Sequence, residues 1–285
     1  MILIKLKGGL GNQLFQYAMG RRAVHANKVD LKLDVLSGFT VIQGEAYRSY
    51  NLHAFNIIEN FASSNEIAKL KKNRFANLIE ELKPYHRRLF IKEHQFHFNS
   101  KILKLSDNTY IEGYWQSEKY FKDIESIIRQ EIVLKKPIAN KYENLIHKTN
   151  SVSIHIRRGD YVTNKRIREA HGACSLNYYY KAIKKITRAI TSPHFFIFSD
   201  DINWVKENLK TKHPITFISD NNTKDYEELI LMSKCKHNIV ANSSFSWWGA
   251  WLNNNQDKIV IAPQKWFNNA SINTKDLIPE SWIKI

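Results

Sequence analysis

The chain has 285 residues, of which 43% are apolar and 12% aromatic, so it is long enough to form one large or two ordinary folded domains. Its 43 Lys and Arg against 27 Asp and Glu give a formal net charge of +16, which favours an anionic partner such as a nucleic acid, an anionic membrane surface or a phosphorylated small molecule. The composition excludes a disordered or repetitive chain, and no apolar run approaches the length of a membrane-spanning helix. Two cysteines fit a reducing compartment without a disulfide framework, so we expect a folded cytoplasmic protein.

The N-terminal half opens as a strand, a glycine-rich turn and a helix. Apolar residues 2–6 predict the strand, Gly8-Gly9-Leu10-Gly11 predicts the turn, and apolar residues at helical spacing predict a helix over 12–26. Residues 35–100 combine aromatic and basic side chains without a clear strand period. The other elements predicted in this half are helices at 64–72, 76–82 and 117–130 and a strand at 110–113.

The C-terminal half alternates short β-rich runs with helical stretches. The predicted strands are 152–156, 194–198, 216–219, 238–241 and 258–262. The predicted helices are 178–190, 203–210, 224–233 and 245–253. This alternation indicates a parallel sheet with crossover helices, whose ligands gather beyond the carboxyl ends of the strands. With a boundary at Lys135-Lys136-Pro137, we expect an α/β fold of two domains, 1–136 and 137–285, with a cleft between them.

The turn Gly8-Gly9-Leu10-Gly11 is followed by Asn12. It allows the backbone to approach a ligand closely and presents amide groups at a helix N-terminus. It is neither a dinucleotide fingerprint nor a P-loop. A tight strand-to-helix turn with Asn12 as the helix cap is the alternative.

The segment SIHIRRGDYV, residues 153–162, is a strand that ends in two arginines. Arginine is a planar, permanently charged fork that suits phosphate oxygens. Strand alternation places Arg157 on the face of His155 and Arg158 on the other face, so we predict that His155 and Arg157 point into a site. Arg158 is then expected to brace Asp160 or the loop. An ion-paired strand end without a ligand is the alternative.

Two further strand ends carry polar residues. Asp200 and Asp201 follow an apolar strand, where they fit a magnesium ion, hydrogen bonds from a base and a ribose, or a helix N-cap. The stretch NSSFSWWGAW, residues 242–251, opens a helix with small hydroxyl residues that present amide groups to an anion. Its three tryptophans are expected to pack in the core.

Several motifs of metal and acyl-transfer chemistry are missing from the sequence. It contains no Asp-x-Asp, Cys-x-x-Cys, His-Glu-x-x-His or Gly-x-Ser-x-Gly. We therefore expect no metal and no acyl-enzyme chemistry.

Taken together, these stretches resemble the bacterial α1,2-fucosyltransferases of glycosyltransferase family 11. The matching segments are GGLGNQLFQYA at 8–18, HIRRGDY at 155–161, FSDD at 198–201 and NSSFSWWGAWL at 242–252. The resemblance implies a GT-B-like pair of Rossmann-like domains, with the acceptor on the N-terminal domain and the donor on the C-terminal one. It also implies metal-independent, inverting transfer of L-fucose from GDP-fucose to the 2-hydroxyl of a terminal galactose. No other cofactor is implied.

The family's site residues carry over onto this sequence. The resemblance implies that Arg157 grips the β-phosphate, His155 lies near the guanosine, and Asp200 or Asp201 binds guanine. The backbone at Ser243, Ser244 and Phe245 would complete the diphosphate cradle, and Asn12 would reach the donor from the other domain.

The proton acceptor is the part of the site for which this sequence departs from its relatives. Some relatives carry a glutamate about ten residues after the motif histidine, where this chain has Lys165, with Glu169 and His171 further on. Asp160 is our candidate, although it equally suits an orienting role toward an arginine, and a loose ion-pair mechanism needs no strong base.

The expected acceptor is a galactose-terminated oligosaccharide or glycolipid of surface glycan synthesis such as lipopolysaccharide. The basic surface leaves open a peripheral contact with an anionic membrane. Two alternatives to the main hypothesis are transfer to another acceptor hydroxyl and, from a different class, a basic nucleic-acid-binding protein. The second lacks any recognisable nucleic-acid-reading motif, so we expect no nucleic acid partner.

Overall fold

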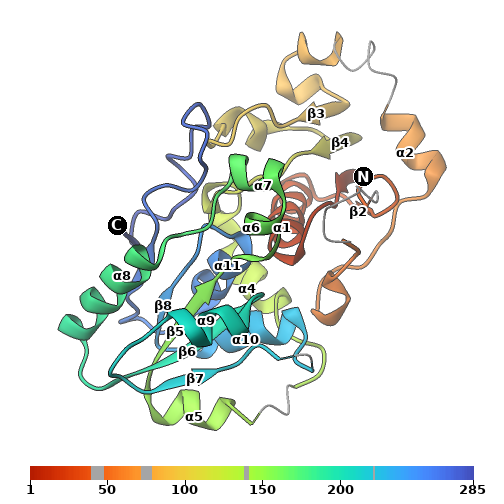
Figure 1. Cartoon of the computed structure of the whole chain (residues 1–285). Helices are drawn as coiled ribbons and strands as arrows, with labels where there is room; N and C mark the ends of the chain where they lie inside the picture. Colours follow the sequence, from red (N-terminus) through yellow and green to blue (C-terminus); the bar gives the residue numbers. More distant parts are fainter. Residues whose placement is uncertain (40–47, 72–78, 138–140, 221) are drawn as a thin grey trace. The chain divides into compact units, whose positions relative to one another are not determined.

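The computed structural model in Figure 1 describes residues 1–39, 48–71, 79–137, 141–220 and 222–285. These residues form two compact units, with a boundary between Lys136 and Pro137. The segment Asn273–Pro279, near the end of the chain, belongs to the first unit, whereas the sequence analysis had assigned it to the second domain. The two units are described separately below.

Unit 1 contains a four-stranded, wholly parallel sheet with the order β2-β1-β4-β3. Its strands are β1 (Ile2–Lys5), β2 (Leu31–Asp34), β3 (Phe90–Lys92) and β4 (Thr109–Glu112). Its helices are α1 (Leu10–Asn27), α2 (Ser64–Leu70) and α4 (Glu125–Glu131), with 3-10 turns at Leu52–Ala54, Tyr85–Arg87, Ser100–Lys104, Glu118–Tyr120 and Lys122–Ile124. The strands predicted at 2–6 and 110–113 are present. The predicted helix 117–130 is divided between two 3-10 turns and α4, and the predicted helix 76–82 begins outside the described residues.

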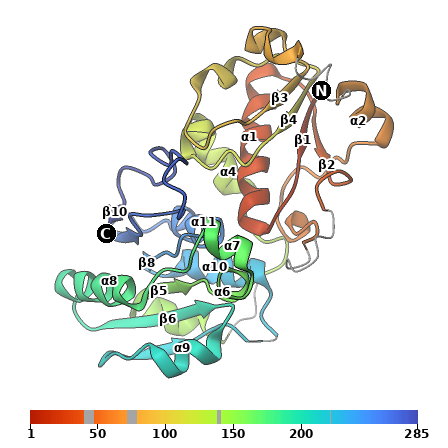
Figure 2. The same ribbon diagram turned by 45° about the horizontal axis from the view of Figure 1, so that its top comes forward.

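The sheet of unit 1 is covered on both faces, which agrees with the view in Figure 2. A side chain added at Gly20 of α1 would lie 3.0 Å from Ile4 and from Leu31, so α1 packs directly against β1 and β2. On the other face, Leu3 joins an apolar cluster with Ile67 of α2. Alternate residues of β1 therefore serve opposite faces, which is why Ile2, Leu3 and Ile4 are all apolar and buried.

Unit 2 contains a six-stranded, wholly parallel sheet with the order β10-β9-β8-β5-β6-β7. Its strands are β5 (Asn150–Ile156), β6 (Pro193–Ser199), β7 (Ile215–Phe217), β8 (His237–Ile239), β9 (Val260–Ala262) and β10 (Ile283–Lys284). Its helices are α5 (Glu143–Lys148), α6 (Gly159–Thr163), α7 (Lys165–Ala170), α8 (Leu176–Ala189), α9 (Ile202–Asn208), α10 (Asp225–Lys234) and α11 (Ser244–Leu252). All five strands predicted for this half are present, in the predicted parallel arrangement, and β10 was missed.

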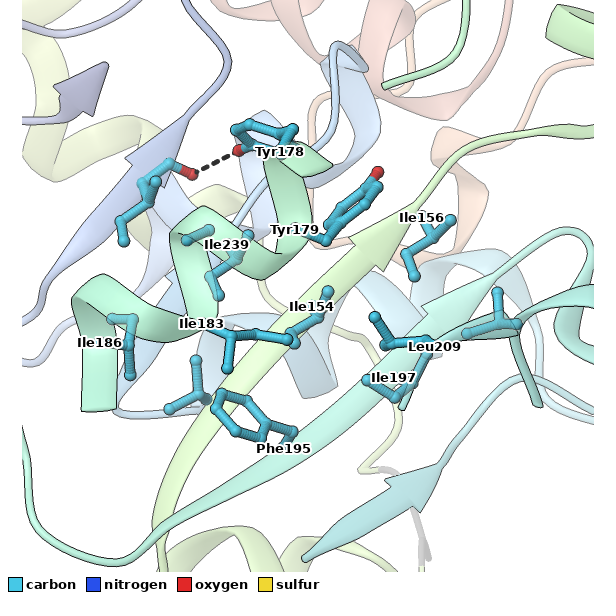
Figure 3. Packing of buried hydrophobic residues seen from close by; sticks show 14 residues of the cluster. Ile154, Ile156, Tyr178, Tyr179, Ile183, Ile186, Phe195, Ile197, Leu209 and Ile239 are labelled. Carbon is cyan, nitrogen blue, oxygen red and sulfur yellow. Dashed lines mark hydrogen bonds between the residues drawn. The ribbon is translucent and has the colours of Figure 1, made fainter. Parts of the chain in front are cut away.

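Helices cover both faces of the unit 2 sheet as well. Figure 3 shows Ile183 and Ile186 of α8 against Ile154 and Phe195 of the sheet, within one buried apolar cluster. The opposite face is covered by α10 and α11, which approach each other closely at Gly249. The three tryptophans of α11 are buried, which confirms that they belong to the core: Trp247, Trp248 and Trp251. Among the described residues, no helix is both long and apolar enough to cross a membrane.

Candidate active site

Three neighbouring strands of unit 2 end at one edge of its sheet. β5 pairs in parallel with β6 on one side and with β8 on the other, so the segments that follow these strands leave from the same edge. The ion pair between Arg157 and Asp200 joins the first segment to the second, and the Tyr161 hydroxyl, which donates to the Asn242 carbonyl at 3.3 Å, joins the first to the third. The structure therefore brings together three of the four predicted strand ends.

Arg157 lies between two carboxylates. Its Nη1 is 2.8 Å from Asp200 Oδ2, and its Nη2 forms an ion pair with Asp160. Its guanidinium carbon lies 5.3 Å from the centre of the Tyr161 ring, and the side chain is 20% exposed. The two ion pairs use two of the five guanidinium N–H groups and fix the plane of the fork. Arg157 is thus oriented in advance, with donors left for an anion.

Arg158 has different partners, which corrects part of the sequence interpretation. Its Nε lies 3.0 Å from Asp201 Oδ2, and its guanidinium carbon lies 3.5 Å from the centre of the Trp204 ring. The prediction that Arg158 braces Asp160 is wrong, because the first turn of α6 brings Asp160 back to Arg157 three residues earlier. The alternative, that Arg158 braces the loop, fits these contacts.

The two adjacent aspartates have separate structural tasks. Asp201 is the N-cap of α9, with its Oδ1 accepting from the Trp204 amide at 3.4 Å, so the capping alternative is present in the structure. Asp200 holds Arg157 instead. A Cβ at Gly159 would lie 2.5 Å from Asp200 Oδ2, so glycine is needed there for Asp200 to reach the arginine.

His155 is buried at the end of β5. Burial, with a smaller contribution from the charge of Arg157, lowers the pKa of His155 to about 3, so its ring is neutral at physiological pH. Its Nδ1 is buried and has no hydrogen-bond partner among the described residues, and its ring centre lies 5.4 Å from that of Phe245. A neutral imidazole with an open nitrogen can hydrogen-bond a ligand without adding charge beside Arg157.

The third strand end opens α11. Ser243 is the N-cap, and its side chain accepts from the Phe245 amide at 3.4 Å. Ser244 is the first helical residue. The amide groups of this first turn lie at the positive end of the helix dipole, so the helix start favours an anion at the same sheet edge as Arg157.

The sequence analysis missed Asn242, the residue before this N-cap. Its buried side-chain amide donates to the carbonyls of His171, Gly172 and Trp266 at 3.3, 2.8 and 3.1 Å, and its Oδ1 accepts from Cys174 Sγ at 3.4 Å. One side chain therefore ties two loops to the end of β8.

These loops support the arginine. The ring of His171 stacks on that of Tyr161, with centres 4.9 Å apart and planes 23° apart, and Tyr161 lies against Arg157. Burial lowers the pKa of His171 and raises that of Tyr161 to about 12, so both rings are neutral at physiological pH. Asn242, His171 and Tyr161 thus form a supporting layer for Arg157.

Asn12, the fourth predicted position, belongs to unit 1. The alternative that it caps the helix is wrong, because α1 begins at Leu10 with Gly9 as its N-cap. Asn12 lies in the first turn, where its Oδ1 accepts from Gln116 Nε2 at 2.8 Å. The turn before it needs glycine: Gly8 has a φ of 76°, and a Cβ there would lie 2.6 Å from Asn12 Nδ2.

Two buried glutamines of the same motif hold its loops, and the sequence analysis did not single them out. Gln13 Nε2 donates to the carbonyls of Gly8 and Ser49 at 2.9 and 2.8 Å. Gln16 Oε1 accepts from the Lys7 amide at 2.9 Å, and its Nε2 donates to the Gly113 carbonyl at 3.1 Å. Both glutamines lie among the apolar residues of the helix. A polar residue in such a place indicates a buried hydrogen-bonding role, and this pattern could have identified them from the sequence.

Glu228 is a further carboxyl group that the sequence analysis missed. It lies on α10, and its burial raises its pKa to about 7, helped by the charges of Asp225, Asp220 and Asp200 and opposed by a hydrogen bond from Ser219. Only the folded structure reveals this burial, because the first turn of α10 carries three acids, Asp225, Glu227 and Glu228, that the sequence does not distinguish.

Glu228 should make stability depend on pH. Its pKa is higher in the folded than in the unfolded chain, so between about pH 4.5 and pH 7 the folded state keeps a proton that the unfolded state has lost. The free energy of unfolding should therefore fall as pH rises through this window. Glu228→Gln keeps the side chain neutral at every pH. Its free energy of unfolding relative to wild type, measured by urea unfolding, should therefore be higher at pH 8 than at pH 5. The exposed Glu207→Gln is the control, and a pH-independent difference between wild type and Glu228→Gln would contradict the argument.

The edge of the unit 2 sheet brings together an oriented arginine, a neutral histidine and a helix start, which suit an anionic ligand, and comparison with known proteins gives the reaction class. A family model described as "Glycosyl transferase family 11" matches residues 1–285. The chain therefore belongs to glycosyltransferase family 11, which confirms the resemblance inferred from its motifs.

Two similar proteins come from Escherichia coli and match along their whole length. The alpha-1,2-colitosyltransferase is 36% identical over 300 residues, which cover 100% of this chain and 99% of the relative. The O-antigen biosynthesis glycosyltransferase WbnK is 32% identical over 307 residues, which cover 98% and 99%.

A solved structure shows the same fold. The crystal structure of NodZ alpha-1,6-fucosyltransferase soaked with GDP-fucose matches 88% of this chain and 91% of its own, with a TM-score of 0.50 and 13% sequence identity. The expected GT-B-like α/β class with parallel sheets is thereby confirmed.

Proposed function

We propose that this chain transfers L-fucose from GDP-fucose to the 2-hydroxyl of a terminal β-galactoside, with inversion at the donor carbon. The observation that carries the proposal is Arg157, a guanidinium held by Asp160 and Asp200 at the carboxyl edge of a parallel sheet. Membership of family 11 supplies the reaction class. A bovine relative named galactoside 2-alpha-L-fucosyltransferase SEC1, 24% identical over 59% of this chain and 47% of its own length, supports the linkage.

In this proposal the unit 2 edge holds the nucleotide. Arg157 and the amide groups of Ser243, Ser244 and Phe245 bind the diphosphate. The neutral His155 lies near the guanosine, and Asp200 or Asp201 accepts hydrogen bonds from the guanine. Asn12 contributes from unit 1.

The chemical step is a single displacement. The bond between the sugar's anomeric carbon and the β-phosphate oxygen breaks, the acceptor oxygen bonds to that carbon, and the acceptor's proton leaves. Negative charge grows on the departing β-phosphate, where a fixed guanidinium and helix-terminal amides are most effective. Such a step requires no protein nucleophile and, in this proposal, no metal.

Asp160 is the candidate proton acceptor. Its ion pair with Arg157 equally supports an orienting role. Asp160 can do both. It can orient Arg157, and it can also accept the proton, because a loose transition state needs only a weak base.

The deciding experiment is turnover of GDP-fucose with lactose, with and without EDTA, and assignment of the product linkage by NMR. We expect an α1,2-linked product that forms equally well with EDTA. If no galactoside gives a product, the proposed acceptor class is wrong. A product with another linkage would favour transfer to the alternative acceptor hydroxyl. Complete loss of activity with EDTA would contradict the proposal that no metal is needed.

A second donor is favoured by one comparison. The relative at 36% identity is named a colitosyltransferase, and colitose is fucose without its 3-hydroxyl. GDP-colitose should therefore compete with GDP-fucose, and the ratio of their kcat/KM values decides which sugar the chain prefers.

The net charge of +16 supports a peripheral contact with anionic membrane, at the cytoplasmic face where a lipid-linked acceptor would be found. Co-sedimentation with phosphatidylglycerol vesicles, absent with neutral vesicles, tests it. The same charge motivates the nucleic-acid alternative. Tight DNA binding at physiological salt, together with no thermal shift from GDP, would favour that alternative over the enzyme.

A further inference from the structure

The segments that lead into β3 and β4 lie side by side at the amino edge of the unit 1 sheet. β3 and β4 are neighbouring parallel strands, so the 3-10 turns before them, Tyr85–Arg87 and Ser100–Lys104, approach the sheet from the same edge. The two turns contact each other, and the Asn99 side-chain amide donates to the Tyr85 hydroxyl at 2.9 Å. The glycine-rich turn follows β1, so this surface lies at the opposite edge of the sheet from it.

Two apolar side chains are exposed beside these turns. Leu82 is 87% exposed, the largest fraction among the large apolar residues that the structure describes. Ile79 is 47% exposed, and its carbonyl accepts from the Leu82 amide at 3.2 Å, so the two residues belong to one helical turn. A single exposed apolar residue is ordinary on a protein surface, whereas neighbouring ones indicate contact with a partner.

The turn that carries Leu82 is held in place by Arg88. The Arg88 guanidinium carbon lies 4.1 Å from the centre of the Tyr85 ring. Its Nε donates to the Lys83 carbonyl at 2.7 Å, and its Nη2 donates to the Glu81 carbonyl. Because the carbonyls on both sides of Leu82 are bound, the leucine is presented to solvent by a fixed turn.

Three exposed cations belong to the two 3-10 turns at this edge. Arg87, Lys101 and Lys104 are exposed, and none of them forms an ion pair with another residue that the structure describes. The acids of the Leu82 turn have partners of their own, which are Lys83 for Glu80 and His94 for Glu81. The positive charge of the three cations is therefore available to an anionic partner.

The exposed leucine decides which kind of anionic partner fits. A nucleic acid is bound by cations along its backbone and by aromatic rings that stack on its bases, and an aliphatic side chain adds little to either. An anionic bilayer uses both features. Its surface potential attracts Lys and Arg, and the boundary between headgroups and acyl chains takes up an apolar side chain.

We propose that Ile79, Leu82, Arg87, Lys101 and Lys104 form a surface that docks unit 1 on an anionic membrane. The leucine inserts below the headgroups, and the three cations lie over anionic lipids. This inference rests on the proposed function for the membrane contact itself, to which it gives a location. It does not depend on which sugar is transferred. We call these five residues the Leu82 surface.

The first test reverses the three charges in the full chain. Arg87→Glu, Lys101→Glu and Lys104→Glu are combined, and binding is measured by co-sedimentation with mixed phosphatidylglycerol and phosphatidylcholine vesicles. Each cation near an anionic surface contributes about a fivefold factor in binding, so the partition coefficient should fall at least about thirtyfold. Wild type should not bind vesicles of phosphatidylcholine alone.

A second triple variant carries the same change in net charge at another place. Lys181→Glu, Lys184→Glu and Lys185→Glu replace three exposed lysines of α8 in unit 2. We expect this variant to bind the mixed vesicles within about threefold of wild type. An equal loss in both triple variants would mean that net charge alone governs binding, and the Leu82 surface would be wrong.

The second test removes the apolar contact. Leu82→Ser should bind the mixed vesicles about tenfold more weakly, because its insertion buries apolar surface. Leu36→Ser is the control, since Leu36 is 60% exposed and follows β2 at the other edge of the same sheet. Wild-type affinity in Leu82→Ser overturns the proposal. So does tight DNA binding at physiological salt that the triple variant of the Leu82 surface abolishes and Leu82→Ser leaves unchanged, because it would assign the cations to a nucleic acid.

Failure of the docking surface and failure of the proposed reaction are distinguishable. Vesicle binding is measured without GDP-fucose, so it gives the same answer whether or not lactose is an acceptor. Lactose is soluble, so its turnover should stay within about twofold of wild type in Leu82→Ser and in the triple variant of the Leu82 surface, which also shows that both are folded. Retained vesicle binding together with a fall in lactose turnover would contradict a role in docking.

Discussion

Replacing Arg157 with lysine is expected to lower the turnover of GDP-fucose at least about a hundredfold. Lysine keeps the positive charge, but its three N–H groups radiate from one nitrogen atom and lack the planar spacing of the guanidinium. It cannot hold Asp160 and Asp200 at once and still direct N–H groups to a phosphate, whereas the guanidinium now does the first with two of its five donors. Stabilisation of a departing phosphate depends on donors fixed before the charge develops, so turnover should fall more than affinity for the donor. Steady-state kinetics with GDP-fucose and lactose measures both.

Arg158→Lys is the matched control for this substitution. Arg158 is the adjacent residue of the same type, but its partners are Asp201 and the face of Trp204. We expect turnover within about threefold of wild type and a small drop in melting temperature from the lost stacking. Near-normal activity of Arg157→Lys would contradict the phosphate role. An equal loss in both variants with unchanged melting would contradict the assignment of the two arginines to separate tasks.

Much of the fold was predictable because most of its strands lie in apolar runs that are regularly spaced along the chain. The five strands predicted for the C-terminal half are all present, since a run such as FFIF in β6 is buried on both faces and reads clearly in one dimension. The strands that were missed, β2, β3 and β10, have four, three and two residues. Strands of equal length, such as β1 and β8, were predicted because each lies in a longer, largely apolar run, 2–6 and 238–241. The missed strands have no such run, so only the pairing with a neighbouring strand identifies them.

The candidate site, too, was predictable only in part. Strand alternation predicted separate tasks for Arg157 and Arg158, and the two side chains do have different partners. It did not identify their partners. Asp160 was linked to either arginine by sequence distance alone, and the helical turn that begins at Gly159 decides for Arg157.

Residues whose role depends on burial could not be found from the sequence. Glu93 lies in the stretch IKEHQFHF, where nothing distinguishes a buried carboxyl group from an exposed one. Its carboxyl oxygens accept hydrogen bonds from the amide groups of Tyr114 and Trp115, which follow a different strand about twenty residues later. Asn242 belongs to a recognised motif, but the sequence analysis assigned a role only to the residues that follow it, because their amide and hydroxyl groups suit an anion.

Asn242→Ala should destabilise the protein by about 2–4 kcal/mol, a large effect for one substitution. The variant leaves three backbone carbonyls without the buried amide that satisfies them, those of His171, Gly172 and Trp266. Leaving a buried polar group unpaired costs more than the bond itself was worth, because water does not replace the lost donor. Urea unfolding monitored by tryptophan fluorescence measures the change.

The same substitution should also affect Arg157 and so lower turnover. Loss of the tie at His171 frees the ring that stacks on Tyr161, and Tyr161 lies against Arg157, so turnover of the folded variant should fall, though less than in Arg157→Lys. Asn269→Ala is the control, because Asn269 is exposed and, among the described residues, its side chain accepts hydrogen bonds from Ser271 alone. The stability of this variant should stay within about 0.5 kcal/mol of wild type. If Asn242→Ala were as stable as this control, the amide of Asn242 would have to be replaceable by water. The supporting layer beneath Arg157 would then depend on the stacked rings alone.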